Sequence, residues 1–248
     1  MLQIHQFPCL ADNYGFLIHD PASGATAAID TPDADEIMRQ ADAKGWRISD
    51  IWNTHWHPDH AGGNAAIKAA TGARVTGPAE VERIGSAPDR IVGEGDRVTL
   101  GALQARVLDV GGHTLGHIAY VFDEAKIAFV GDALFALGCG RIFEGTPQQM
   151  WASLQKIAAL PDEATLYCAH EYTLSNARFA ASVDGGNAAL KARIGEIERA
   201  RAAGKPTVPM RLSEEKATNP FLRAPLLLPA LADWEAFAEI RKQKDAFK

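Results

Sequence analysis

The sequence predicts a layered α/β protein with two β-sheets flanked by helices, followed by a smaller helical domain. Up to about residue 170, short apolar runs with strand composition are mixed with helical segments. From about Tyr172 onward the strand-like runs stop and helical segments take over. Neither a GxGxxG after a strand nor a GxxxxGK[ST] occurs, so no Rossmann array or P-loop is indicated. We therefore expect one domain at residues 1–171 and a helical domain at 172–248.

The individual elements follow from apolar periodicity and from the turn residues between the runs. Strands are expected at 2–7, 14–20, 26–30, 48–55, 73–77, 97–100, 103–110, 117–123, 126–132 and 165–170. Helices are expected at 33–45, 63–70, 146–160, 173–182, 187–203 and 230–247. Thr31 and Pro32 predict the cap and first position of the first helix, and Thr146 and Pro147 do so for another. The Pro-rich stretch 206–229 is expected to be irregular.

Composition places the chain among globular proteins and limits its partners. Of 248 residues, 47% are hydrophobic and 23% are charged, and 25 Lys and Arg against 31 Asp and Glu give a net charge of −6. This charge, without any basic run, argues against binding to nucleic acid or anionic membranes. Three scattered cysteines, no signal-peptide pattern and no apolar run of about 18 residues predict a cytoplasmic protein without a membrane segment. We expect a monomer.

The segment HWHPDH at 55–60 is the strongest indication of chemistry. His55 and His57 lie two apart at the end of an extended run, so their rings point to the same side and can hold one ion. Asp59 and His60 follow Pro58 into a turn, where they can offer a carboxylate and an imidazole to a second ion. The alternatives are a surface histidine cluster or a single structural zinc, but no Cys-rich shell accompanies these residues.

Further ligands for two ions must come from distant parts of the sequence. His113 and His117 follow the strand that ends at Val110, Asp132 ends the strand KIAFV, and His170 ends TLYCA. Sheet proteins gather site residues at strand ends, so these four are candidates. A polar turn residue is the competing interpretation for each one taken singly.

These motifs resemble a known superfamily. THWHPDHAGG, GGHTLGH, GDALF and AHEY, in this order and spacing, are similar to the metallo-β-lactamase superfamily. GDALFALGCGRIFEG, AHEYTLSNARFA and ATNPFLR resemble its glyoxalase II branch, hydroxyacylglutathione hydrolase, and the match covers nearly the whole chain. The resemblance implies an αββα sandwich of two mixed sheets with flanking helices, plus a C-terminal helical domain that binds substrate.

The resemblance also implies a ligand set. The first metal would be bound by His55, His57 and His113, the second by Asp59, His60 and His170, with Asp132 bridging both. Asp59 and Asp132 would be the catalytic carboxylates, and His117 would be structural or support a ligand. Asp30 resembles an early aspartate that orients metal-site groups by hydrogen bonding, although a structural strand-end role is equally open. Two divalent ions are expected, zinc first, with iron or manganese as alternatives.

The family pattern also assigns substrate contacts. Glutathione carries two carboxylates, and Arg141, Tyr172 and Arg223 match positions that contact it. At Phe143 some relatives carry a tyrosine, so one hydroxyl contact is missing here. No basic residue follows soon after Arg223. The candidates for holding the glycine carboxylate of glutathione are therefore Arg223 together with backbone groups, or Arg241, Lys242 or Lys244. A solvent-exposed charge is the competing interpretation for each cation.

The expected activity is hydrolysis of the small-molecule thioester S-D-lactoylglutathione, and of related 2-hydroxyacyl thioesters, by a metal-bridging hydroxide. This is the second step of methylglyoxal detoxification in the family that the chain resembles. No Ser or Cys nucleophile is expected, because Cys139 and Cys168 look structural. One alternative is a mononuclear-iron dioxygenase for glutathione persulfide, against which the retained His60 and His170 argue. The other is a noncatalytic metalloprotein that binds glutathione conjugates.

Overall fold

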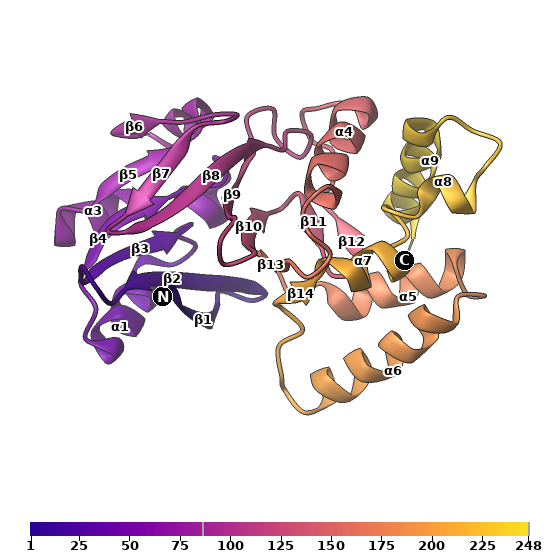
Figure 1. Cartoon of the computed structure of the whole chain (residues 1–248), viewed down its shortest axis with the longest axis horizontal. Helices are drawn as coiled ribbons and strands as arrows, with labels where there is room; N and C mark the ends of the chain where they lie inside the picture. The colour runs from indigo at the N-terminus through magenta and orange to yellow at the C-terminus, as the bar shows by residue number, and fades with distance from the viewer. Residues whose placement is uncertain (86, 248) are drawn as a thin grey trace. The chain divides into compact units, whose positions relative to one another are not determined.

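The computed structural model describes residues 1–85 and 87–247, and internal contacts divide the chain into two compact units. The first unit comprises Met1–Asp109 and Gly116–Gly131. The second unit comprises Val110–Leu115 and Asp132–Lys248. Figure 1 labels their helices and strands, and each unit is described by itself.

Two six-stranded sheets confirm the predicted fold class. The first has the order β1 to β6, antiparallel from β1 to β3 and parallel from β3 onward, with strands Gln3–Cys9, Asn13–Asp20, Ala25–Ile29, Ile48–Trp52, Arg74–Gly77 and Arg90–Ile91. The second has the order β14-β13-β10-β9-β8-β7, and in ascending number its strands are Arg97–Leu100, Leu103–Asp109, Ile118–Phe122, Ile127–Gly131, Thr165–Cys168 and Met210–Arg211. A small hairpin joins β11 (Leu134–Phe135) to β12 (Gly138–Cys139).

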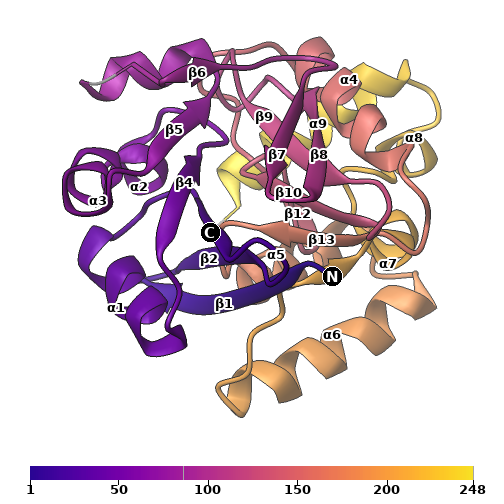
Figure 2. The same ribbon diagram turned by 60° about the vertical axis from the view of Figure 1, so that its left-hand side comes forward.

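In the first unit, helices cover one face of the first sheet and strands of the second sheet cover the other. Helices α1 (Ala34–Lys44) and α3 (Asn64–Thr71) bury Ile37 and Ile67 against that sheet, and Figure 2 shows both helices beside it. On the opposite face, Trp52 of β4 packs against Tyr120 of β9, with ring centroids 5.3 Å apart. These apolar contacts bring the carboxyl end of β4 to the edge of the sandwich, where the HWHPDH segment begins.

The start of the first helix differs from the prediction. Asp33, rather than Thr31, is the N-cap of α1, and its side chain accepts a hydrogen bond from the Glu36 backbone. Thr31 instead donates its hydroxyl proton to Asn64, 2.7 Å away. A carboxylate caps a helix N-terminus as well as a hydroxyl does. The Thr31 side chain is hydrogen-bonded to Asn64 and is therefore not available to cap α1. The predicted cap Thr146 is confirmed, and Asn187, where a helix was expected to begin, is the N-cap of α6.

Helices dominate the second unit. Their bounds are Pro147–Ala158 for α4, Thr173–Val183 for α5, Ala188–Ala202 for α6, Leu212–Thr218 for α7, Ala224–Leu227 for α8 and Asp233–Ala246 for α9. Helices α5 and α6 bury Ala180 and Leu190 around Leu137, and α9 packs its Phe237 against Trp151 of α4. The described residues contain no helix that is both long enough and apolar enough to cross a bilayer.

The Pro-rich stretch 206–229 is more regular than its composition predicts, so that expectation is wrong. It contains β14, α7 and α8, with β14 paired to β13. Pro225 falls in the first turn of α8, where a missing backbone N–H is tolerated. Helix α7 begins directly after β14, and its buried Glu215 and Thr218 anchor it in the second unit. Tertiary contacts therefore override the local tendency to irregularity.

Candidate metal centre

His55 lies three residues beyond the end of β4 and is fully buried. The hydroxyl of Thr54 donates its single proton to Asp30, at 2.8 Å. The contact between Thr54 Oγ1 and His55 Nδ1, at 3.0 Å, therefore requires the ring nitrogen to donate. With Nδ1 protonated, the lone pair of His55 is on Nε2, the atom that faces His57.

The spacing of His55 and His57 fits two ligands of one ion. His55 Nε2 and His57 Nδ1 lie 3.1 Å apart. Two nitrogens about 2.0–2.1 Å from a tetrahedral zinc ion are separated by roughly 3.3 Å. The extended backbone of His57 before Pro58, with ψ 147°, holds this pairing as the sequence predicts.

Asp59 and His60 lie in the one-turn helix α2 (Pro58–Ala61), and they form a second pair of candidate ligands. Asp59 Oδ2 is 3.6 Å from His60 Nε2, a separation that also suits two donors on one cation. The carboxylate of Asp30 is 2.8 Å from His60 Nδ1 and can accept its proton, which leaves the Nε2 lone pair for a metal. Asp30 is itself buried and accepts the Thr54 backbone N–H at 2.7 Å.

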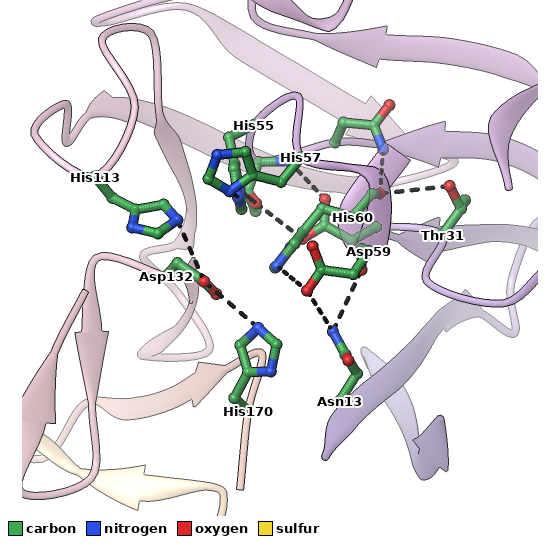
Figure 3. A network of polar contacts seen from close by, with 12 residues as sticks. Asn13, Thr31, His55, His57, Asp59, His60, His113, Asp132 and His170 are labelled. Atoms are coloured by element: carbon green, nitrogen blue, oxygen red, sulfur yellow. Dashed lines mark hydrogen bonds and ion pairs between the residues drawn. The ribbon is translucent and has the colours of Figure 1, made fainter. Parts of the chain in front are cut away.

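Hydrogen bonds from neighbouring segments hold the turn that carries Asp59 and His60 (Figure 3). The carbonyl of His60 accepts hydrogen bonds from Thr31 N at 2.7 Å and from Asn53 Nδ2 at 3.0 Å. Asn13, from the start of β2, donates to both the carbonyl and the carboxylate of Asp59. The sequence analysis did not identify Asn13 or Asn53 as site residues. The one feature that could have indicated them is that each is a polar residue at the end of a strand.

The second unit holds the other three candidate ligands, with two histidines beside one carboxylate. Asp132 Oδ2 lies 3.5 Å from His113 Nε2 and 3.4 Å from His170 Nε2, as the dashed lines in Figure 3 indicate. His113 Nδ1 is 2.8 Å from the carbonyl of Arg141, which can only accept, so its Nε2 carries the lone pair. One oxygen within ligand spacing of two separate imidazoles suits a carboxylate that is shared by two cations.

The imidazoles of the second unit are fixed by aromatic neighbours. Tyr172 stacks on His170 with ring centroids 4.6 Å apart and planes within 4° of parallel, and Phe135 approaches His170 edge-on. Phe143 lies edge-on against His113, with ring centroids 5.2 Å apart.

Gly140 lies close to the backbone of Asp132. A Cβ at Gly140 would come within 2.0 Å of the Asp132 carbonyl oxygen, so only glycine allows this close approach.

The hairpin that follows Asp132 is clamped by buried side chains of the C-terminal segment. Asn219 Nδ2 donates to the carbonyls of Phe135 and Gly138, at 3.1 and 2.9 Å. Glu215 Oε2 accepts from the backbone N–H of Leu137 at 3.0 Å, and its other oxygen pairs with Arg193. Glu215 and Asn219 are fully buried. Neither was among the predicted site residues.

The predicted substrate contacts differ in accessibility. The side chain of Arg141 is 59% exposed, and Tyr172 is 37% exposed. Arg223 is less accessible, with a side chain that is 21% exposed, and its Nε forms a 2.8 Å ion pair with Asp184. Lys244 contacts Ser175 and lies over the rings of Phe179 and Phe247, and burial, as the main cause, lowers the pKa of its ammonium.

The remaining singled-out residues have structural surroundings. His117 is fully buried and stacks on His55, with ring centroids 4.6 Å apart. Burial is the main cause that raises the pKa of Cys139 to about 11 and that of Cys168 to about 12. A thiol with such a pKa is protonated at neutral pH and is a poor nucleophile, which supports the structural reading of both cysteines.

Two family models match successive parts of the chain. The model described as "Metallo-beta-lactamase superfamily" matches residues 15–170. The model described as "Hydroxyacylglutathione hydrolase C-terminus" matches residues 171–247.

The similarity to known proteins extends over the whole length of the chain. The chain is 61% identical to a hydroxyacylglutathione hydrolase of Erythrobacter litoralis, covering 100% of both chains. It is 56% identical to one of Hyphomonas neptunium, covering 100% of this chain and 99% of the relative. Among solved structures, ETHE1 from Myxococcus xanthus is 26% identical with a TM-score of 0.71, covering 97% of this chain and 90% of that one.

Proposed function

Because the chain belongs to the hydroxyacylglutathione hydrolase family of the metallo-beta-lactamase superfamily, we propose that it hydrolyses S-D-lactoylglutathione and related S-(2-hydroxyacyl)glutathiones. The products are glutathione and the free hydroxy acid, D-lactate for the first substrate. The observation that carries this proposal is the donor chemistry, five imidazoles and two carboxylates in pairs with the spacing of metal ligands.

We propose that the two sets of donors form one binuclear centre. His55, His57 and His113 bind one ion, Asp59, His60 and His170 bind the other, and Asp132 bridges them. The support for the bridge comes from the second unit, where Asp132 Oδ2 lies at ligand spacing from one histidine of each set. Imidazole and carboxylate donors suit zinc, iron or manganese, and zinc stays the predicted metal.

The side chains of this site would orient the reacting groups. When bound, the pair of ions lowers the pKa of a water molecule toward neutrality and stabilises negative charge on the thioester oxygen. Asp30 and the Arg141 carbonyl hold the protons of His60 and His113 on the nitrogens that face away from the ions. The leaving thiolate is weakly basic, with a thiol pKa of about 8.5, so the chain needs no strong acid at sulfur.

The C-terminal segment, residues 172–248, is proposed to bind glutathione, and residues 1–171 are proposed to carry the metals. Arg141, whose backbone carbonyl lies beside His113, has a largely exposed guanidinium, and Tyr172, whose ring stacks on His170, is partly exposed. Arg223 remains a candidate for a glutathione carboxylate, and Arg241, Lys242 and Lys244 remain the alternatives. A monomer in the cytoplasm stays a prediction.

The activity is tested with purified chain and S-D-lactoylglutathione. We expect loss of the thioester absorbance in proportion to enzyme, loss of activity after chelation, and recovery on addition of zinc. Metal analysis should find two ions per chain. Absence of metal-dependent turnover would refute the proposal, and oxygen consumption with glutathione persulfide would favour the dioxygenase alternative instead.

Substitution of the proposed glutathione contacts should weaken substrate binding more than it slows the chemical step. We expect Arg141→Ala and Arg223→Ala each to raise KM about 10-fold, the effect of losing one charge-assisted hydrogen bond, with kcat nearly unchanged. Arg39→Ala is the matched control, because that side chain is 64% exposed on α1 and pairs with Glu36 of the same helix. A fall in kcat at constant KM in either arginine variant would contradict its binding role.

A further inference from the structure

We infer that Asn13 is a positioning residue for Asp59, holding its carboxylate where the second ion binds; this rests on the metal assignment proposed above. Asn13 is the first residue of β2 and pairs with Cys9 across a tight turn. Leu10 in that turn adopts a φ of 48°. Only 6% of the surface of Asn13 is exposed, so its amide is committed to interior contacts.

The amide nitrogen of Asn13 gives both of its hydrogen bonds to Asp59. Nδ2 lies 3.1 Å from Asp59 Oδ2 and 3.3 Å from the Asp59 carbonyl oxygen, as Figure 3 shows. An ionised carboxylate and a carbonyl can only accept, so the NH₂ group must face them. Its two protons can thus serve the backbone and the side chain of the same residue.

The backbone contact replaces a hydrogen bond that the helix cannot supply. A helical carbonyl at Asp59 would ordinarily accept from the N–H of Gly63, four residues later. That N–H instead donates to the Thr31 carbonyl, at 2.9 Å. Asn13 therefore satisfies a carbonyl at the end of a one-turn helix and ties the turn to the first strands of the sheet.

The side-chain contact selects the position of the carboxylate. The Asp59 side chain is 39% exposed, whereas those of Asp30 and Asp132 are 7% and 8% exposed. An accessible carboxylate loses rotamer freedom when it binds a metal, and a donor that holds it in place beforehand reduces that cost. The oxygen held by Asn13, Oδ2, is also the one at ligand spacing from His60 Nε2.

The inference predicts a selective loss of the second ion. In Asn13→Ala and in Asn13→Leu, which fills similar space without a donor, affinity for the second equivalent of Zn²⁺ should fall about 10–100-fold. Affinity for the first equivalent should stay within about threefold, since His55 and His57 are not touched by Asn13. Zinc titration of the metal-free full-length chain against a chelating dye measures both steps, and kcat should fall while KM stays constant.

Thr26→Val is the matched control, because Thr26 is fully buried in the same unit and its hydroxyl contacts His19 at 2.9 Å. It should keep both zinc affinities. Unchanged binding of the second ion in folded Asn13 variants, or an equal loss of both ions, would overturn the positioning role. If the unmodified chain itself failed to bind two ions or to hydrolyse the thioester, the proposed function would fail instead.

Discussion

Replacement of Asp132 by alanine should abolish thioester hydrolysis and reduce the metal content below two ions per chain. Asp132 Oδ2 is at ligand spacing from both His113 and His170, so its removal takes a donor from each proposed ion. Loss of a residue that only supports a metal ligand typically costs 10–100-fold in activity or affinity, and we expect a larger effect here. Turnover and metal content of the purified variant provide the measurement.

Two further variants make the Asp132 result specific. Asp132→Asn keeps the volume but removes the negative charge, and it should also lose metal, because an amide oxygen is a weaker ligand for zinc. Asp123→Ala removes a carboxylate that pairs with Arg106 at the surface, at 2.8 Å, and should keep both ions and full activity. An Asp132→Ala protein with two ions and normal turnover would rule out the bridging role.

Replacement of Glu215 by alanine should produce the largest loss of stability among these substitutions. Glu215 is fully buried, pairs with Arg193, and accepts hydrogen bonds from Leu137 N and Asn219 Nδ2. Removing one partner of a buried ion pair leaves the other charge uncompensated and costs about 3–5 kcal/mol. For a chain of this size that lowers the melting temperature by about 6–20 °C.

The neighbouring residue on α7 provides the control for Glu215. Lys216 forms an ion pair with Asp162 at 2.5 Å, but both side chains are substantially exposed, at 36% and 69%. Lys216→Ala should therefore change the free energy of unfolding by no more than about 1 kcal/mol. Thermal unfolding followed by circular dichroism compares the two variants. Equal melting temperatures for both would show that the Glu215 cluster contributes little to stability.

The sequence determined the local half of the metal site. The predicted strand 48–55 ends at Trp52 instead, but the segment after it, with the proline and the turn that follow, still brings His55 beside His57 and places Asp59 and His60 in the next turn. Such geometry depends on dihedral preferences within a few residues, so a motif read along the chain is enough to predict it. The strand-end positions of His113, Asp132 and His170 were likewise visible in the sequence.

Only the tertiary structure decided which side chains hold those ligands in place. Asn13 lies 46 positions before Asp59, and Asn219 lies 81 positions after the Gly138 carbonyl that it binds. For the same reason the sequence did not predict helices α7 and α8 in the Pro-rich stretch, or Asp33 as the N-cap of α1. Hydrogen bonds between distant segments form only after apolar packing has brought their backbones together. No local sequence pattern shows which distant residues will then lie side by side.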